Sequence, residues 1–494
     1  MSEPSPGSAT GTTAAHVGRA LLYAAIVTAA AAVPLVLWPF DSALIGDTYG
    51  RAYRPFELLG LTGSVAILLI AGLELRTRRR RTLADVLPVV LPVLVAFVFL
   101  GLVVEYSRKS WDYRCYEGAA KALVAGSDPY EGTAYLYPPL LAQLLAGAYQ
   151  LTAWIQAAVG RAGAGAPDST WFVVFYLYQC LQLLVVNLVF LLLYRFARRL
   201  EIDRPQALVL VAALVLCNHP LLRTLRHNQI NLYLVGLILL ATLTMGSRPF
   251  LGGLLVALGA HLKLYPALVA LPMLIVRGWT ALLGVVAGVA GIVLLQTRLG
   301  TDFSLWERFR ALAGSFPRSR TFRDNSLESV VSNVTRFGLQ TAGITEVRVQ
   351  SIASALALAT SLAVLVWFAA RFLRRESAYR RLERRAAEPA HGWDVAFHRF
   401  SGHVVDCVAL MLLLSPMVWE HHYVLALPLA VWAVATRGSS RPWSIGFALV
   451  LMFAVPTFDV FPLSYHRIAG LLMLVALTPP RESHQSQAQG DQSQ

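Results

Sequence analysis

Long apolar stretches, separated by short polar or basic segments, recur along most of the chain. Most are close to the roughly 20 apolar residues that an α-helix needs to cross a bilayer, and none alternates as a membrane-spanning strand does. Only helices and closed barrels satisfy their backbone in lipid, so the pattern predicts an all-α, polytopic transmembrane protein with about 12 to 14 spans. The apolar segments lie at residues 20–39, 57–75, 83–104, 138–159, 171–194, 207–217, 230–246, 250–276, 279–296, 351–373, 403–418, 423–436, 443–457 and 466–478.

Composition excludes a soluble globular enzyme. Of the 494 residues, 56% are hydrophobic and only 14% are charged, against roughly 25% charged in soluble domains. We expect a single transmembrane domain over residues 19–479, flanked by disordered cytoplasmic tails at 1–18 and 480–494. No signal-peptide cleavage pattern follows the first tail, so the first apolar segment is expected to stay as a helix.

The net charge of +14 is carried almost entirely by arginine, since Lys109, Lys121 and Lys263 are the only lysines. In a soluble protein this surplus would indicate nucleic acid, but here the basic residues lie mostly between apolar segments. The positive-inside rule accounts for them, and no nucleic-acid partner is expected. Residues 76–81 and the basic loop at 374–400 should therefore be cytoplasmic.

Counting spans from these two basic segments places residues 105–137 and 419–423 on the outer face, and the long loop at 297–350 also becomes an outer loop. The middle of the chain leaves two alternatives open. Two apolar segments lie between the outer loop and the arginines at 195–204, so one of them is re-entrant or interfacial. The segment at 250–276, interrupted by Lys263 and Pro266, is either one span or two short ones.

The first outer loop contains a predicted surface helix. From Trp111 to Val124 the apolar positions recur at helical spacing, and Asp112 and Tyr116 share one flank of the helix. A helix of this kind lies along the membrane surface. Asp112 is a candidate general base, and the alternative is an ordinary solvated carboxylate on an amphipathic helix.

Three further polar clusters adjoin apolar segments. Ionisable groups at membrane depth are costly and are functional candidates, although a lone Arg or Lys at a span end more often snorkels to the interface. Zinc is a weaker alternative, because adjacent His421 and His422 lack the i, i+4 spacing of helix-borne ligands. The four cysteines are scattered, so neither a metal site nor a disulfide is expected. The clusters are Arg223, Arg226, His227, Asn228, Gln229 and Asn231; His261 and Lys263; and Glu420, His421, His422 and Tyr423.

Together these groups suit one chemistry. An outer carboxylate can act as general base on a hydroxyl, which gains roughly 10² to 10⁴-fold in rate, while cationic and imidazole groups neutralise a departing phosphate. A lipid phosphate would lie at the interface, where these groups are found. Neither a GxGxxG loop nor a P-loop is present, so a nucleotide donor has no support and no cofactor is expected.

Seven short motifs, in this order, resemble those of polytopic glycosyltransferases of the GT-C superfamily, and more narrowly glycosyltransferase family 87. Each motif is weak by itself, but their order over about 310 residues is more specific. They are Trp111–Ala120 (WDYRCYEGAA), Gly126–Tyr130 (GSDPY), Tyr137–Pro139 (YPP), His227–Leu232 (HNQINL), His261–Pro266 (HLKLYP), Asp324–Ser329 (DNSLES) and Ser415–Tyr423 (SPMVWEHHY).

The resemblance implies a GT-C-like fold whose outer loops carry short surface helices. It implies an inverting, metal-independent transfer from a polyprenyl-phospho-sugar on the extracytoplasmic face of the plasma membrane. Mannose is the sugar of the characterised family members. Asp112 matches the family's base, and His421 or His422 matches its donor-phosphate histidine, with His421 favoured.

Other roles follow less directly. Lys263 and Arg226 are expected to bind the donor phosphate, on the basis of charge. The expected partners are the donor, a lipid-linked or glycan acceptor, and membrane lipids. Substrate contacts are expected from Tyr116, His227, Asn228, Asn231, Asn325, Glu420 and Tyr423.

Two other functions fit the same composition. A transporter or flippase of a lipid-linked or anionic substrate would place its ionisable groups near mid-span, in broken helices related by a repeat. No internal repeat is visible, and the best candidate acids lie in outer loops, which favours an enzyme. The second alternative is a scaffold subunit of an envelope assembly, but that function would not explain the polar clusters.

Overall fold

The structure is a computed structural model. It describes residues 109–158, 167–216, 218–314, 324–341, 345–385, 392–457 and 460–479, together with four isolated residues nearer the N-terminus. The first three predicted apolar segments, the arginines at 76–81 and both predicted tails lie outside these ranges. Every regular element of the described part is helical, which agrees with the all-α prediction.

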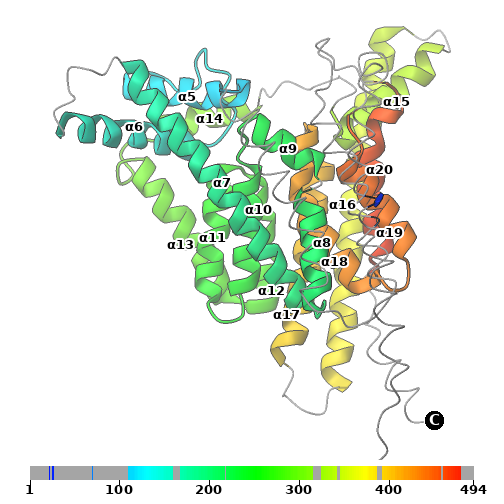
Figure 1. The fold of residues 1–494 in the computed structure, drawn as a ribbon. Helices are drawn as coiled ribbons and strands as arrows, with labels where there is room; N and C mark the ends of the chain where they lie inside the picture. The colour runs from blue at the N-terminus through cyan, green and yellow to red at the C-terminus, as the bar shows by residue number, and fades with distance from the viewer. Residues whose placement is uncertain are drawn as a thin grey trace, which may run out of the picture.

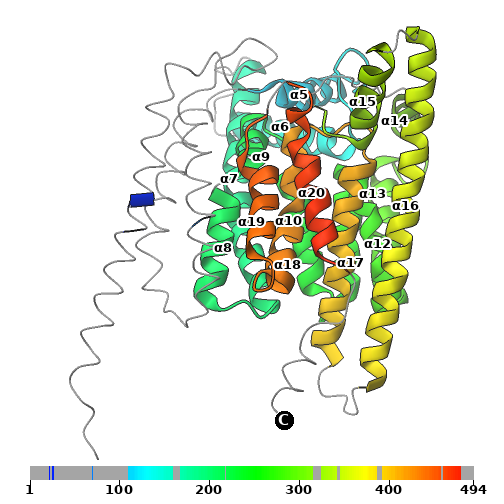
Figure 2. The ribbon, with the colours of Figure 1, turned by 90° about the vertical axis from the view of Figure 1, so that its right-hand side faces the viewer.

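In the described part of the chain, helices form a bundle in which they run roughly alongside one another (Figure 1). Figure 2 shows that α16 and α17 extend beyond the others at one end. The helices are α7 (Pro167–Arg199), α8 (Arg204–Leu216), α10 (Asn231–Thr244), α11 (Pro249–Leu262), α13 (Trp279–Gln296), α16 (Glu346–Arg385), α17 (Gly392–Leu414), α18 (Leu427–Arg437), α19 (Pro442–Leu449) and α20 (His466–Leu477).

Four stretches of the described residues are long and apolar enough to cross a membrane: Ser169–Arg199, Trp279–Gln296, Arg348–Arg381 and Ala396–Leu414. A fifth crossing results if the bent pair Arg204–Val215 and His219–Arg226, which meet at 52°, forms one span. Shorter apolar helices, including α10, α11 and α20, pack among them. The chain is therefore a polytopic helical protein.

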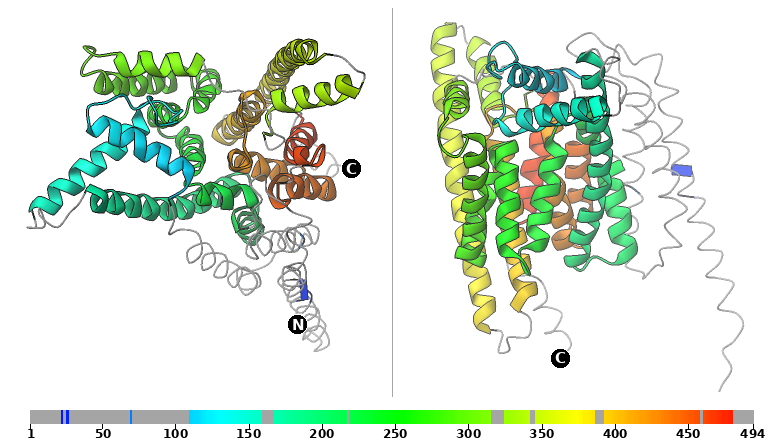
Figure 3. Two further views of the ribbon diagram at one scale, coloured as in Figure 1. Left: turned by 90° about the horizontal axis from the view of Figure 1, so that it is seen from above. Right: turned by 90° about the vertical axis from the view of Figure 1, so that its left-hand side faces the viewer.

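Helix α5 (Trp111–Val124) has the bounds that the sequence predicts. Ser110 caps its N-terminus by accepting a hydrogen bond from the Tyr113 backbone N–H, and Gly126, with φ of +74°, follows its end. The helix does not continue the bundle. With α6 (Leu140–Ala158) it lies across one end of it, as both views in Figure 3 show.

The position of α6 settles one open alternative. Its glutamines Gln143, Gln150 and Gln156 make it too polar to qualify as a span. It packs against α5 and α7 at the end of the bundle. Helix α7 is thus the single crossing between the loop before α6 and the arginines at its own C-terminus, Arg198 and Arg199.

The second alternative is settled in favour of two short helices. Residues 250–276 divide into α11, the 3₁₀ turn η2 (Tyr265–Val269) and α12 (Ala270–Arg277). Lys263 lies in the break, with an extended backbone. Helix α11 also approaches α13 closely, because a Cβ added at Gly253 or Gly284 would overlap the backbone of the other helix.

The two ends of the bundle differ. One end, which we call the cavity end, carries α5, α6, α9 (His219–Arg226), α14 (Ser304–Gly314), α15 (Leu327–Thr341) and the 3₁₀ helix η4 (Glu420–Ala426). The other, the basic end, holds the turn between α7 and α8 and the lower ends of α16 and α17, which carry the described parts, 374–385 and 392–400, of the predicted basic loop (Figure 2). The remaining short elements, η5 (Val450–Ala454) and η6 (Leu463–Tyr465), flank the loop before α20.

Candidate active site

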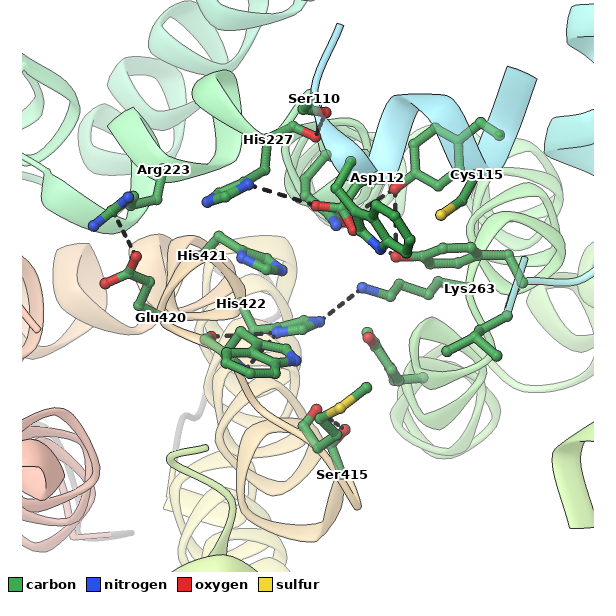
Figure 4. Close-up of a pocket in the computed structure, with 18 of the residues that line it drawn as sticks. Ser110, Asp112, Cys115, Arg223, His227, Lys263, Ser415, Glu420, His421 and His422 are labelled. Atoms are coloured by element: carbon green, nitrogen blue, oxygen red, sulfur yellow. Dashed lines mark hydrogen bonds and ion pairs between the residues drawn. The ribbon is translucent and has the colours of Figure 1, made fainter. Parts of the chain in front are cut away.

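A cavity of about 1400 Å³ opens at the cavity end of the bundle. Its wall comes from α5, the loop before α6, the C-terminal turn of α9, the break after α11, the end of α17 and η4. Polar side chains from these separate segments point into the same space (Figure 4). The cavity therefore brings together three of the polar clusters that the sequence analysis singles out.

Asp112 stands in the first turn of α5 and is 26% exposed at its side chain. Its Oδ2 atom lies 3.8 Å from Nδ1 of His227, and its carboxyl group is hydrogen-bonded by the side chain of Gln229. Burial raises the pKa of Asp112, and the hydrogen bond from Gln229 and the charge of Lys263 oppose that rise only in part. The carboxylate is thus a stronger base than a solvated aspartate.

A polar turn between α9 and α10 is fastened to the start of α5. Ser110 Oγ donates to the backbone O of His227 at 2.5 Å, and Ser110 N donates to Oδ1 of Asn228 at 3.0 Å. Asn228 adopts a φ of +53°, a conformation that asparagine tolerates better than most residues. The turn therefore holds His227 and Gln229 against Asp112.

Lys263 occupies the opposite wall and is buried. Its Nζ lies 2.9 Å from Nε2 of His422 and 2.9 Å from Oδ1 of Asn231. The rings of Tyr137 and Tyr265 approach the ammonium group at 5.2 and 5.1 Å, within the range of cation–π attraction. Burial lowers the pKa of Lys263 to about 7, although the charge of Asp112 works against this shift.

The two adjacent histidines have different surroundings. The ring of His421 lies between those of His227, at a centroid distance of 5.8 Å, and His422, at 4.5 Å. Its backbone O accepts hydrogen bonds from Thr224 and Asn231. Burial lowers the pKa of both His421 and His422, so both imidazoles are neutral and can each donate one N–H.

Glu420 fixes η4 behind these histidines. One carboxylate oxygen lies 2.6 Å from Nε of Arg223, while the other accepts a hydrogen bond from Thr457 and lies 3.9 Å from Arg467. Burial alone would raise the pKa of Glu420, but the charge of Arg223, with other nearby cations, holds it below its usual range. The residue is therefore ionised and paired.

Eight of the twelve predicted site residues line the cavity, and four lie behind its wall. Asn231 bonds Lys263 and the His421 carbonyl. Asn325 donates through its backbone to Val418 O at 2.8 Å, and its carbonyl accepts from Tyr423. These buried residues support the wall. The eight are Asp112, Tyr116, Arg226, His227, Lys263, Glu420, His421 and His422, and the four are Asn228, Asn231, Asn325 and Tyr423.

Some lining residues are missing from the predicted site. Tyr137 and Gln229 lie inside quoted motifs but are not predicted to contact substrate, and Trp419 and Tyr265 also line the cavity. Their signal in the sequence is only proximity to a stronger candidate, because uncharged side chains beside apolar segments are common. No group of three His, Cys, Asp or Glu side chains in the described residues could hold a metal ion.

Comparison with known proteins identifies the family. The sequence profile of glycosyltransferase family 87 matches residues 135–392, more than half of the chain. The chain belongs to glycosyltransferase family 87. Asp112, His421 and His422 lie outside the matched range of this family member, so their assignment rests on the motifs and on the geometry of the cavity.

This family 87 protein is similar to a curated mannosyltransferase. That relative is the polyprenol-phosphate-mannose-dependent alpha-(1-2)-phosphatidylinositol pentamannoside mannosyltransferase of Mycolicibacterium smegmatis, 28% identical over 282 residues. The alignment covers 54% of this chain and 61% of the relative, which is less than two thirds of the relative's length. No solved structure matches the chain.

Proposed function

We propose that the chain is an inverting membrane glycosyltransferase that moves a sugar from a polyprenyl-phosphate donor to a hydroxyl of a lipid-linked or glycan acceptor. The observation that carries the proposal is the single cavity in which Asp112 faces Lys263, Arg226, His421 and His422. A carboxylate on one wall and cationic or N–H-donating groups on the other are the two components that this transfer needs. The relative's name supports mannose as the sugar.

The proposed step is a single displacement. The acceptor oxygen attacks the anomeric carbon while the bond from that carbon to the phosphate oxygen breaks. The hydroxyl proton passes to Asp112, and the bonding electron pair leaves with the polyprenyl phosphate. Since the new bond forms opposite the leaving group, a β-linked donor gives an α-linked product.

The leaving phosphate gains negative charge during this step, and the wall opposite Asp112 supplies the compensation. Lys263 and Arg226 contribute positive charge, and neutral His421 contributes an N–H. Hydrogen-bond donors that are already oriented in a site with little water stabilise such charge strongly. Nε2 of His422 lies 2.9 Å from Nζ of Lys263, and since a charged ammonium can only donate, His422 accepts from it in that state and orients it.

The proposal places the cavity on the extracytoplasmic side. The basic end of the bundle carries residues 374–385 and 392–400, which are rich in arginine, and arginine-rich loops face the cytoplasm. The cavity lies at the other end, beside α5. This polarity supports an outward-facing site, and the plasma membrane is the location that the family resemblance implies.

Purified protein tested with a panel of polyprenyl-phospho-sugars decides the matter. We expect transfer from the mannosyl donor, and we expect Asp112→Asn to lower kcat by roughly 10² to 10⁴-fold while the protein remains folded in detergent. Full activity of Asp112→Asn would overturn the assignment of the base. If labelled donor crosses the membrane of proteoliposomes without any chemical change, the protein is a transporter and not an enzyme.

A further inference from the structure

Gln229 lines the cavity together with Asp112 and has no role in the proposed transfer. It is 2% exposed and hydrogen-bonds the carboxyl group of Asp112. Its own backbone O accepts from Gln182 at 3.3 Å, and the preceding Asn228 is held by Ser110. The position of the residue is therefore determined from both sides of the turn.

Two tyrosine hydroxyls determine which way the amide of Gln229 faces. Oε1 of Gln229 lies 3.2 Å from the hydroxyl of Tyr116 and 3.2 Å from that of Tyr137. Burial raises the pKa of both tyrosines, so their hydroxyls keep their protons and can donate. An amide oxygen accepts from such donors, and this directs the NH₂ group of Gln229 to Asp112.

The reversed amide would face the wrong partners. An amide oxygen turned toward an ionised carboxylate places two acceptors against each other, and a buried acceptor without a donor costs about 1–3 kcal/mol. The observed orientation therefore matches Asp112 in its ionised form, which is the form that can accept a proton.

We infer that Gln229 is the positioning residue of the base: its amide, oriented by Tyr116 and Tyr137, donates to Asp112 and holds the carboxylate toward the acceptor hydroxyl. The effect of Gln229 on catalysis rests on the proposed function. The hydrogen bond from Gln229 to the carboxyl group of Asp112 can be tested without it.

Other groups also influence the pKa of Asp112, so the test variants must leave those groups unchanged. Because Lys263 and His227 remain in every variant below, a change in the titration of Asp112 reports the loss of the amide. The charged and titratable side chains that line the cavity with Asp112 are Lys109, Arg114, Cys115, Tyr116, Tyr137, Arg223, Arg226, His227, Lys263, Tyr265, Glu420, His421 and His422.

The first variant is Gln229→Met, which keeps the length of the side chain and removes the donor. A hydrogen bond to a charged group corresponds to roughly 1 to 2 pKa units. Loss of the bond destabilises the ionised carboxylate, so the acid limb of kcat/KM is expected to move to higher pH by about that amount. The carboxylic-acid carbonyl band in infrared difference spectra, wild type minus Asp112→Asn, should titrate with the same shift.

The tyrosines are tested together. Either hydroxyl alone can orient the amide, so Tyr116→Phe and Tyr137→Phe should each shift the limb little, whereas the double variant should approach Gln229→Met. Tyr135→Phe is the matched control, because the buried hydroxyl of Tyr135 donates to Pro138 O and not to Gln229. A thermal unfolding midpoint confirms that each variant is folded.

The outcomes separate this inference from the proposed function. If the wild type transfers no sugar from any donor, the proposed function fails, and the infrared band of Gln229→Met still decides the role of Gln229. An unmoved band and acid limb in folded Gln229→Met would overturn the inference. If Asp112 titrates in the double tyrosine variant at the same pH as in the wild type, the orienting role of the hydroxyls is overturned.

Discussion

Nζ of Lys263 lies 2.9 Å from Nε2 of His422, although the two residues come from distant parts of the chain. The contact joins the break after α11 to η4 and sets one wall of the cavity. Burial leaves Lys263 with a pKa of about 7. The group that we propose to bind the donor phosphate through its charge therefore changes charge close to neutral pH.

The first prediction concerns this titration. Lys263 is charged below pH 7 and loses its charge as the pH rises through about 7, so donor binding should weaken above that pH. The limb should be seen in kcat/KM, which reports the free enzyme. Lys263→Met should lower kcat/KM for the donor roughly 10- to 100-fold at pH 6 and abolish the alkaline limb. A limb that persists in Lys263→Met belongs to another group.

The second prediction separates the two histidines. His421→Ala should lower kcat/KM for the donor by roughly 10²-fold, because one N–H donor to the developing phosphate charge is lost. His422→Gln is the matched variant, since glutamine can still accept from Lys263, and its loss should stay below about tenfold. Steady-state kinetics with the natural donor measures both. If His422→Gln loses more kcat/KM than His421→Ala, the phosphate contact belongs to His422.

The third prediction concerns the contact of α11 with α13. Gly284→Ala should destabilise the protein, because the added methyl group would overlap the backbone of Phe250, and overpacking of this kind costs about 1–3 kcal/mol. Gly291→Ala, on the same helix, has nothing within 4 Å of the added group and should leave stability unchanged. Thermal unfolding in detergent compares the two. Equal midpoints would show that the helices can separate at no cost.

The fourth prediction concerns a buried ionic cluster whose residues do not line the cavity. Asp406 on α17 accepts hydrogen bonds from Arg371 at 2.9 Å and Arg375 at 2.8 Å, both on α16. Asp406→Asn leaves two buried arginines without their carboxylate, which costs about 3–5 kcal/mol. Glu307→Gln, at an exposed acid on α14, is the control and should cost less than about 0.5 kcal/mol. An unchanged unfolding midpoint for Asp406→Asn would exclude a stabilising cluster.

The parts of the fold that could be predicted are those set by residues close together in the sequence. The bounds of α5 follow from its apolar spacing, with Ser110 before it and Gly126 after it. The orientation of α6 could not be predicted from its sequence, because an uncharged apolar run is typical of a span. Only its contacts with α5 and α7 show that it lies across the bundle. The break at Lys263 was predicted as one of two alternatives, since a single charge and a proline also occur within spans.

The site shows a similar division. Asp112 and the adjacent histidines stand out because charged and imidazole groups are costly beside apolar segments. Their meeting in one cavity depends on contacts between distant segments, such as Asp112 with His227. Gln229 and Tyr137 act through hydrogen bonds to other side chains, and the residue types alone give no sign of such bonds.

The cluster of Arg371, Arg375 and Asp406 has a consequence for biogenesis. Arg371 and Arg375 lie toward the basic end of α16, and both find their carboxylate on α17, so α16 without α17 holds two arginines that lack this partner. Insertion of α16 and α17 as a pair would let Asp406 neutralise these charges as soon as both helices are present. The order in which the ribosome delivers these helices is part of how the protein reaches the membrane.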